Sequence, residues 1–166
     1  MRGIGGGSNM RLGVISDTHG DRWAIEECIQ LAGHVDAWLH LGDNVRDTKR
    51  LEDAGVPVYG VRGNTDFGTS QVTERIVELG GKRLFLCHGH TYGVEASLTR
   101  LYLRAKELGC DAALFGHTHV AFLDEDGEVT LLNPGSPSRP RGGSRRAMGM
   151  LTIRGDVLDG ELLFLP

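Results

Sequence analysis

Histidine and carboxylate side chains gather in five short turns of this chain. Five of the seven histidines fall in these turns, and only His34 and His40 lie elsewhere. In chain order, the turns carry Asp17 and His19, then Asp43, then Asn64, then His88 and His90, and finally His117 and His119. Imidazole nitrogens and carboxylate or amide oxygens suit borderline and hard divalent metals, and no thiolate accompanies them. The turns therefore indicate a metal centre.

The first turn shows how two ligands can share one ion. Asp17 and His19 follow the apolar run Leu12–Ile15, and alternate residues of an extended chain project to the same side. Together the five turns hold too many ligands for one tetrahedral ion, and enough for two ions bridged by a carboxylate. Two metals about 3.5–4 Å apart can generate hydroxide at neutral pH and hold an anion for in-line displacement. The residues alone therefore predict a dinuclear centre that hydrolyses a phosphate ester.

Each turn comes directly after a predicted β-strand. In the first half, strands are expected over residues 11–16, 37–41 and 56–61, with helices over residues 22–32 and 48–54. Asp21 is expected to cap the first helix and Gly33 to end it. This alternation predicts a parallel sheet with right-handed crossovers, and ligands bind beyond the carboxyl ends of such strands. The polar turns should therefore meet at one edge of the sheet.

The second half of the chain changes its pattern. A hairpin is expected over residues 72–79 and 83–87, then a helix over residues 94–108 and a strand over residues 112–115. Strands over residues 120–123, 129–132, 148–153 and 157–164 follow without an intervening helix, so this half is expected to be antiparallel. The predicted fold is α/β, with two stacked mixed β-sheets flanked by helices. Residues 10–166 are expected to form a single domain.

The first residues and the composition of the chain indicate where in the cell the protein is expected. Residues 1–9 are glycine-rich and lack a hydrophobic pattern, so they are expected to be an added flexible leader before a native start at Met10. No apolar run approaches the roughly 20 residues of a membrane span, and no secretory signal is visible. These features predict a cytoplasmic protein that does not engage membranes. The formation of a homo-oligomer is left open.

The net charge and the cysteines argue against several other classes of protein. The formal net charge of −4 argues against general nucleic-acid binding. Cys28, Cys87 and Cys110 are odd in number and lack Cys-x-x-Cys spacing, which disfavours structural zinc and a disulfide framework. All three are expected to be small buried residues in a reducing compartment, and Cys87 should point into the core because it precedes His88 in a strand.

The spaced motifs resemble those of the calcineurin-like metallophosphoesterase superfamily. The matching residues are Asp17-Thr18-His19, Gly42-Asp43, Gly63-Asn64-x-Asp66, His88 and Gly116-His117-Thr118-His119. The compact length and the later Asn133-Pro134-Gly135-Ser136 are similar to the small YfcE-type phosphodiesterase branch. The resemblance covers nearly everything from Met10 onward, and it implies the αββα metallophosphoesterase sandwich.

The resemblance also implies a role for each matching residue. One metal would be bound by Asp17, His19 and His119, and the second by Asn64, His88 and His117, with Asp43 bridging both ions. A hydroxide between the ions would attack phosphorus in line, and Asn64 would also touch the phosphate of a small ester substrate. Manganese is the expected metal, with iron, nickel or zinc as alternatives. The implied activity is that of a two-metal-dependent phosphodiesterase.

Several neighbouring residues have competing interpretations. His90 is expected to lie on the same side of the chain as His88. Two interpretations of His90 are equally favoured: a residue that faces the substrate or supports a ligand, and an ordinary loop histidine. His40 and Asp66 are expected to be structural, and Asn44 more often serves a turn than a substrate. Residues 133–137 are expected to form a rigid turn at the edge of the site. Arg139 and Arg141 would then form an anion-attracting rim, against the alternative of a solvated loop.

One position departs from the pattern of many phosphatases in the superfamily. They carry histidine after the motif asparagine, where it stabilises the transition state or protonates the leaving group, whereas this chain has Thr65. A hydroxyl group is a poor general acid at neutral pH. Esters with good leaving groups, such as aryl phosphodiesters, are therefore expected to be favoured over alkyl monoesters.

Two rival functions remain at this stage. The first is a scaffold module of the same fold, like the retromer subunit that resembles this branch but has a degraded metal site; the complete set of matching ligands disfavours it. The second is a nucleotide-specific phosphodiesterase or phosphatase. The sequence shows no cap domain and no obvious base-stacking aromatic residue that would support one particular nucleotide.

Overall fold

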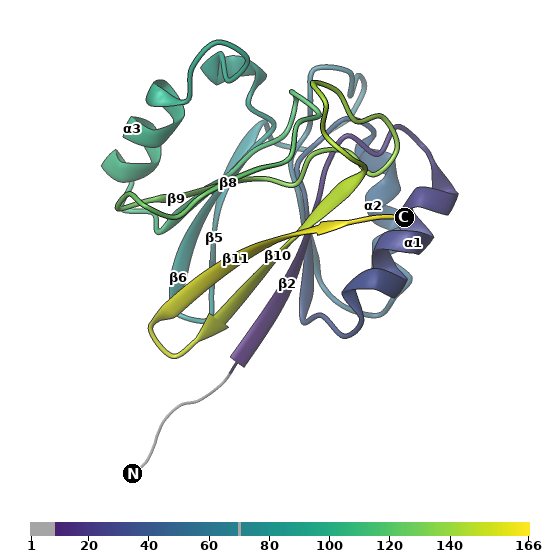
Figure 1. Ribbon diagram of the computed structural model, residues 1–166, viewed down its shortest axis with the longest axis horizontal. Helices are drawn as coiled ribbons and strands as arrows, with labels where there is room; N and C mark the ends of the chain where they lie inside the picture. Colours follow the sequence, from purple (N-terminus) through teal and green to yellow (C-terminus); the bar gives the residue numbers. More distant parts are fainter. Residues whose placement is uncertain (1–8, 70) are drawn as a thin grey trace.

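Two five-stranded sheets stack face to face, with helices on their outer faces (Figure 1). The computed structural model describes residues 9–69 and 71–166. This αββα arrangement confirms the predicted fold class. Within those residues, no helix is long and apolar enough to cross a membrane.

The first sheet contains the three parallel strands that were expected. Its order is β11 (Val157–Phe164), β10 (Ala147–Arg154), β2 (Asn9–Ile15), β3 (Ala37–His40) and β4 (Val58–Gly60). Strands β2, β3 and β4 are parallel to one another, and β10 is antiparallel to both β2 and β11. Asn9, the first described residue, belongs to β2 and pairs with Arg154. Residues 1–8 lie outside the described part of the chain.

Helices α1 (Arg22–Ala32) and α2 (Thr48–Glu52) cover the outer face of this sheet, and the short 3₁₀ helix η1 (Val45–Asp47) precedes α2. Asp21 caps α1 as predicted, since its carboxylate accepts a hydrogen bond from the Ala24 N–H at 3.0 Å. Gly33 ends the helix with a φ of 67°.

The second sheet corrects the antiparallel expectation for the later strands. Its order is β5 (Glu74–Leu79), β6 (Lys82–Cys87), β7 (Ala112–Leu114), β9 (Thr130–Asn133) and β8 (Phe122–Asp124). Strand β9 pairs with β7 in parallel, although β8 and β9 form an antiparallel pair. Leu131 and Leu132 bury both faces of β9, which suits an interior position, whereas the more exposed β8 suits the edge.

The helix expected over residues 94–108 begins later than predicted. Residues 90–92 form the 3₁₀ helix η2 (His90–Tyr92), and α3 spans Thr99–Glu107. Gly93 has a φ of 63°, which turns the chain away before the helix can start. The Ser97 hydroxyl then accepts a hydrogen bond from the Thr99 N–H at 3.2 Å at the new start.

Three apolar layers hold the sandwich together. The central layer lies between the sheets and includes Leu12, Leu39, Leu84 and Leu114. Outer layers pack α1 and α3 on the two sheets, and they contain the cysteines: Cys28 belongs to α1, and Cys87 and Cys110 lie in the layer beneath α3. All three thiols are free and buried, as expected. Burial raises the pKa of Cys28 to about 12, so this thiol stays neutral.

Backbone hydrogen bonds join the turns at the carboxyl ends of the strands. The Asp17 N–H donates to the Gly42 carbonyl at 2.9 Å, and the Gly116 N–H donates to the His88 carbonyl at 2.8 Å. The turns also pack without spare room at Gly63, where a Cβ atom would lie 2.3 Å from Asp43 Oδ1 and 2.6 Å from the Asp43 nitrogen. Asp43 therefore keeps its place only because residue 63 has no side chain.

Replacing Gly63 by alanine should displace the Asp43 turn. We expect Gly63→Ala to lower the free energy of unfolding by about 1–3 kcal/mol, the usual cost of overpacking. Gly127→Ala is the matched control, because its Cβ would meet only the hydroxyl end of Tyr102, at 3.0 Å. Urea unfolding of both variants measures the difference, and equal stabilities would contradict the tight packing around Asp43.

Candidate metal centre

Asp17 lies just beyond β2 with one carboxylate oxygen engaged and the other free. Its Oδ2 atom accepts hydrogen bonds from the Ser16 hydroxyl at 2.7 Å and from the His117 N–H at 3.0 Å. Its Oδ1 atom is buried without a hydrogen-bond partner, and it lies 3.1 Å from Nε2 of His119. A buried carboxylate oxygen in this position is costly unless a positive charge meets it.

His119 is oriented so that a lone pair points at that oxygen. Its Nδ1 atom lies 2.6 Å from the Arg139 carbonyl oxygen, which can only accept, so Nδ1 carries the proton of the neutral ring. Nε2 is then an acceptor that faces Asp17 Oδ1, another acceptor. Two lone pairs aimed at each other call for a cation between them. Without an ion, the hydrogen bond to the Asp17 carboxylate raises the pKa of His119, because a proton on Nε2 would meet the same need for positive charge.

His88 repeats the same arrangement at the end of β6. Its Nδ1–H donates to the Leu41 carbonyl at 2.7 Å, which leaves Nε2 buried without a partner. That nitrogen lies 3.4 Å from Asp43 Oδ2 and 3.8 Å from Asp17 Oδ1. Burial by itself lowers the pKa of His88, but the interaction with Asp43 and the charge of Asp17 outweigh it and raise the pKa.

Asp43 lies between the histidines of the two sheets. Its Oδ2 atom is 3.4 Å from Nε2 of His88 and 3.9 Å from Nε2 of His19, and its Oδ1 atom accepts a hydrogen bond from the Thr65 N–H at 3.1 Å. Although burial raises the pKa of Asp43, the contacts with His88 and Thr65 hold it well below its usual range. Asp43 is therefore an ionised carboxylate whose Oδ2 atom faces both His19 and His88.

Four predicted ligands form a compact candidate site. One ligand atom from each of Asp17, His19, Asp43 and His119 lies within 4.8 Å of the others. The Nε2 atoms of His19 and His119 are 3.4 Å apart, and burial lowers the pKa of His19, which keeps its ring available as a ligand. With the unpartnered atoms of Asp17 and His88, this donor set fits divalent metal ions.

The remaining predicted residues lie beside this group. The His117 ring centroid is 5.2 Å from that of His88, and its Nε2 atom is 3.6 Å from Oε2 of Glu95. The His90 ring is 5.4 Å from His88, and its buried Nδ1 atom has no hydrogen-bond partner. Asn64 is exposed and shares a cavity of about 250 Å³ with His90. The structure thus brings these residues to one region, while their roles as ligands or substrate contacts remain predictions.

The ligand turns use a backbone conformation that side chains usually avoid. Within the described part of the chain, the non-glycine residues with positive φ are Asp17 (56°), His19 (49°), Asp43 (59°), Asn44 (75°), His117 (73°) and His119 (60°). Each such residue costs of order 1 kcal/mol or more and persists only where the surroundings enforce it. All six belong to the turns of the candidate centre.

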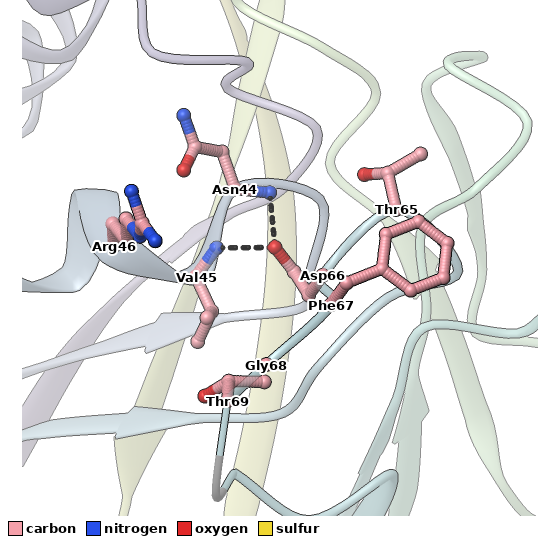
Figure 2. A pocket seen from close by; sticks show the side chains of 8 residues that line it. All are labelled: Asn44, Val45, Arg46, Thr65, Asp66, Phe67, Gly68 and Thr69. Carbon is pink, nitrogen blue, oxygen red and sulfur yellow. Dashed lines mark hydrogen bonds between the residues drawn. The ribbon is translucent and has the colours of Figure 1, made fainter.

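Asp66 enforces the conformation of two of these turns, as predicted. Its Oδ2 atom accepts the N–H groups of Asp43 at 2.9 Å and Gly63 at 2.8 Å. Its Oδ1 atom accepts those of Asn44 and Val45, both at 2.8 Å (Figure 2). One carboxylate thereby ties the turn after β3 to the turn after β4. Asn44 serves this turn and also lines the adjoining cavity.

His40 is structural, as expected. Its Nδ1 atom accepts the Gly42 N–H at 3.2 Å, so Nε2 carries the proton and donates to the Thr18 hydroxyl at 3.0 Å. Thr18 in turn donates to Asp47. Complete burial lowers the pKa of His40, which keeps the ring neutral in this role.

The turn at residues 133–137 does more than the sequence indicated. The Asn133 amide donates to the Gly116 carbonyl at 3.2 Å and to the Thr118 hydroxyl at 2.9 Å. The Ser136 hydroxyl donates to the Asp17 carbonyl at 2.8 Å. These side chains therefore support two ligand turns. Nearby, Arg139 lines a cavity of about 250 Å³ with His19, Asn44, Thr65 and Asp66, and Arg141 does not.

An aromatic residue that sequence reasoning passed over also borders the site. Phe67 is 86% exposed and lines cavities on both sides of the Asp66 turn. The signal that could have found it is its position directly after the Gly63-Asn64-Thr65-Asp66 motif.

The stacked sheets and the histidine–carboxylate centre at their strand ends define a metallophosphoesterase-type fold. The family model of the calcineurin-like phosphoesterase superfamily domain matches residues 10–156. The chain belongs to this family, as its motifs predicted.

Named relatives agree with this assignment. The probable metallophosphoesterase YsnB of Bacillus subtilis (strain 168) is 33% identical over 153 residues, covering 89% of this chain and 87% of that protein. The phosphodiesterase YfcE of Escherichia coli (strain K12) is 33% identical over 167 residues, covering 86% and 87%. A crystal structure of a predicted phosphoesterase from Streptococcus pneumoniae TIGR4 has a TM-score of 0.81 at 30% identity, covering 95% of this chain and 90% of that one.

The fold is shared more widely than these relatives. Vps29 of Entamoeba histolytica, in a crystal structure with Zn²⁺, has a TM-score of 0.70 at 19% identity, covering 93% of this chain and 98% of that one. At this identity the likeness concerns the fold alone.

The position of Asp43 predicts an unequal effect of two ligand substitutions. We expect Asp43→Ala to lower the bound metal from about two ions to fewer than one, because its carboxylate faces both groups of histidines. His19→Ala should mainly weaken one ion. Metal analysis of each purified variant after equilibration with Mn²⁺ and gel filtration measures the stoichiometry. Greater metal loss from His19→Ala than from Asp43→Ala would contradict the bridging assignment.

Proposed function

We propose that this chain is a two-metal-dependent phosphodiesterase that acts on small phosphate esters in the cytoplasm. The observation that carries the proposal is the pair of Nε2 lone pairs of His88 and His119, each fixed by an Nδ1 hydrogen bond to a carbonyl and each aimed at a carboxylate oxygen. Such second partners are the usual means of orienting metal-binding imidazoles. The 33% identity to the phosphodiesterase YfcE supports diesters as the substrate class.

In this proposal, each of the two ions takes ligands from both sheets. Asp17, His19 and His119 would hold one ion, Asn64, His88 and His117 would hold the other, and Asp43 would be shared by both. When bound, a pair of divalent ions, manganese above all, would supply hydroxide at neutral pH and offset the negative charge of the phosphate. The chain itself orients the reaction. Asn64 donates its amide N–H to a phosphate oxygen, and His90, in the same cavity, contacts the ester group.

Metal-dependent turnover tests this proposal directly. Protein stripped with chelator should not hydrolyse bis(p-nitrophenyl) phosphate, and Mn²⁺ should restore turnover together with about two bound ions per chain. A panel of phosphodiesters, phosphomonoesters and nucleotides, assayed with and without Mn²⁺, should show diester cleavage as the preferred reaction. His88→Ala should abolish that cleavage, because it removes a fixed ligand.

A scaffold of the same fold is the second candidate, and the fold shared with Vps29 is compatible with either function. A scaffold would not need two ions or turnover. Fewer than one bound metal and no metal-stimulated cleavage across the panel would contradict the enzyme and support the scaffold. The compact group of Asp17, His19, Asp43 and His119, with His88 beside Asp43, supports the enzyme.

Thr65 predicts a strong dependence on the leaving group. Its N–H holds Asp43, and its side chain is exposed beside Phe67, where its hydroxyl cannot act as a general acid at neutral pH. We expect the turnover of aryl methyl phosphodiesters to fall steeply as the pKa of the leaving phenol rises, and alkyl esters to react slowest. Thr65→Val should leave the slope unchanged, and Thr65→His should flatten it. Equal rates for alkyl and aryl esters, with chemistry rate-limiting, would contradict the prediction.

A further inference from the structure

Phe67 is exposed in a way that no packing requirement explains. In the described part of the chain it is the most exposed of the large hydrophobic side chains, at 86%. It is not part of any of the three apolar layers. An isolated exposed aromatic residue is unremarkable on an ordinary surface, so its meaning depends on what surrounds it.

The backbone that carries Phe67 is held rigidly. The preceding Asp66 side chain accepts four backbone N–H bonds, from Asp43, Asn44, Val45 and Gly63. The Phe67 N–H itself donates to the Thr65 carbonyl at 3.2 Å. A ring on a fixed backbone, with only two side-chain torsions, loses little conformational entropy when a ligand stacks on it.

Phe67 lines two cavities, and one of them also contains predicted site residues. It lines a cavity of about 250 Å³ with Arg62, Asn64 and His90, and another of about 360 Å³ with Asn44, Arg46 and Thr65. Figure 2 shows the ring projecting from its loop on the side of Thr65 rather than of Arg46. The first cavity connects Phe67 to Asn64 and His90, the residues assigned above to the phosphate and its ester group.

We propose that Phe67 is a stacking platform that selects phosphate esters bearing an aromatic ring, either an aryl group or a nucleobase. The ring of the ester lies against Phe67 in the cavity of Arg62, Asn64 and His90, and its phosphate lies at the metal centre. The half-buried Arg62 places a positive charge in that cavity, which suits an anionic ester. This preference depends on the proposed function, because the phosphate must be held at the centre for the ester group to reach Phe67.

Phosphonates test the platform without turnover, since their C–P bond is not hydrolysed by phosphoesterases. Titration calorimetry of the full chain loaded with Mn²⁺ should show phenylphosphonate binding about five- to tenfold more tightly than methylphosphonate, the range expected for one stacked ring. Phe67→Ala should remove this preference and leave the Kd for methylphosphonate unchanged, whereas Phe67→Tyr should retain it. The 5′-methylenephosphonate analogue of adenosine monophosphate, titrated alongside, shows whether the platform favours a nucleobase over a simple aryl ring.

Trp23→Ala is the matched control. Trp23 is 82% exposed and lines a cavity with Arg22 and Glu26, none of which belongs to the candidate centre. Its substitution should leave the phenyl preference intact. A preference that survives Phe67→Ala, or is absent from the unsubstituted chain while methylphosphonate still binds, would overturn the stacking proposal alone. Failure of the Mn²⁺-loaded chain to bind either phosphonate would overturn the proposed function with it.

Discussion

The structure depends on the burial of two carboxylates, Asp17 and Asp43, beside imidazole nitrogens whose lone pairs point toward them. Desolvated anionic oxygens without partners would destabilise any fold unless positive charge compensates them. The raised pKa values of His88 and His119 show the protein drawing positive charge toward these carboxylates. Every neighbouring feature serves to hold this arrangement, from the carbonyls of Leu41 and Arg139 to the glycine at position 63.

The turns around the candidate centre have a strained backbone, and hydrogen bonds from neighbouring side chains offset this strain. Five of the seven predicted ligands occupy left-handed backbone conformations that are unfavourable when isolated. Asp66, Asn133 and Ser136 hold the affected turns through backbone groups, from outside the set of ligands. Polar side chains in the turns therefore have two separate tasks, since some face the centre and others fix the backbone that presents it.

Much of this architecture could be predicted because each ligand turn follows a short apolar strand, and strand ends in parallel sheets converge. The residues that gather around Asp17 and Asp43 were all identifiable from type and position. The pairing between distant strands could not be predicted in the same way. Strand β9 lies beside β7 because its burial on both faces outweighs the sequential hairpin pattern. The supporting role of Asn133 and the exposure of Phe67 were also hidden, since both depend on contacts or space that no local pattern encodes.

The division of the centre between the two sheets has a mechanical consequence. Asp17, Asp43 and Asn64 follow strands of one sheet, and His88, His117 and His119 follow strands of the other. The spacing of the ligands is therefore set by the thickness of the apolar layer between the sheets. Leu39 and Leu84, which lie in the strands and outside the turns, are among the side chains that set this distance. The central core therefore sets the spacing of the candidate site as well as stabilising the fold.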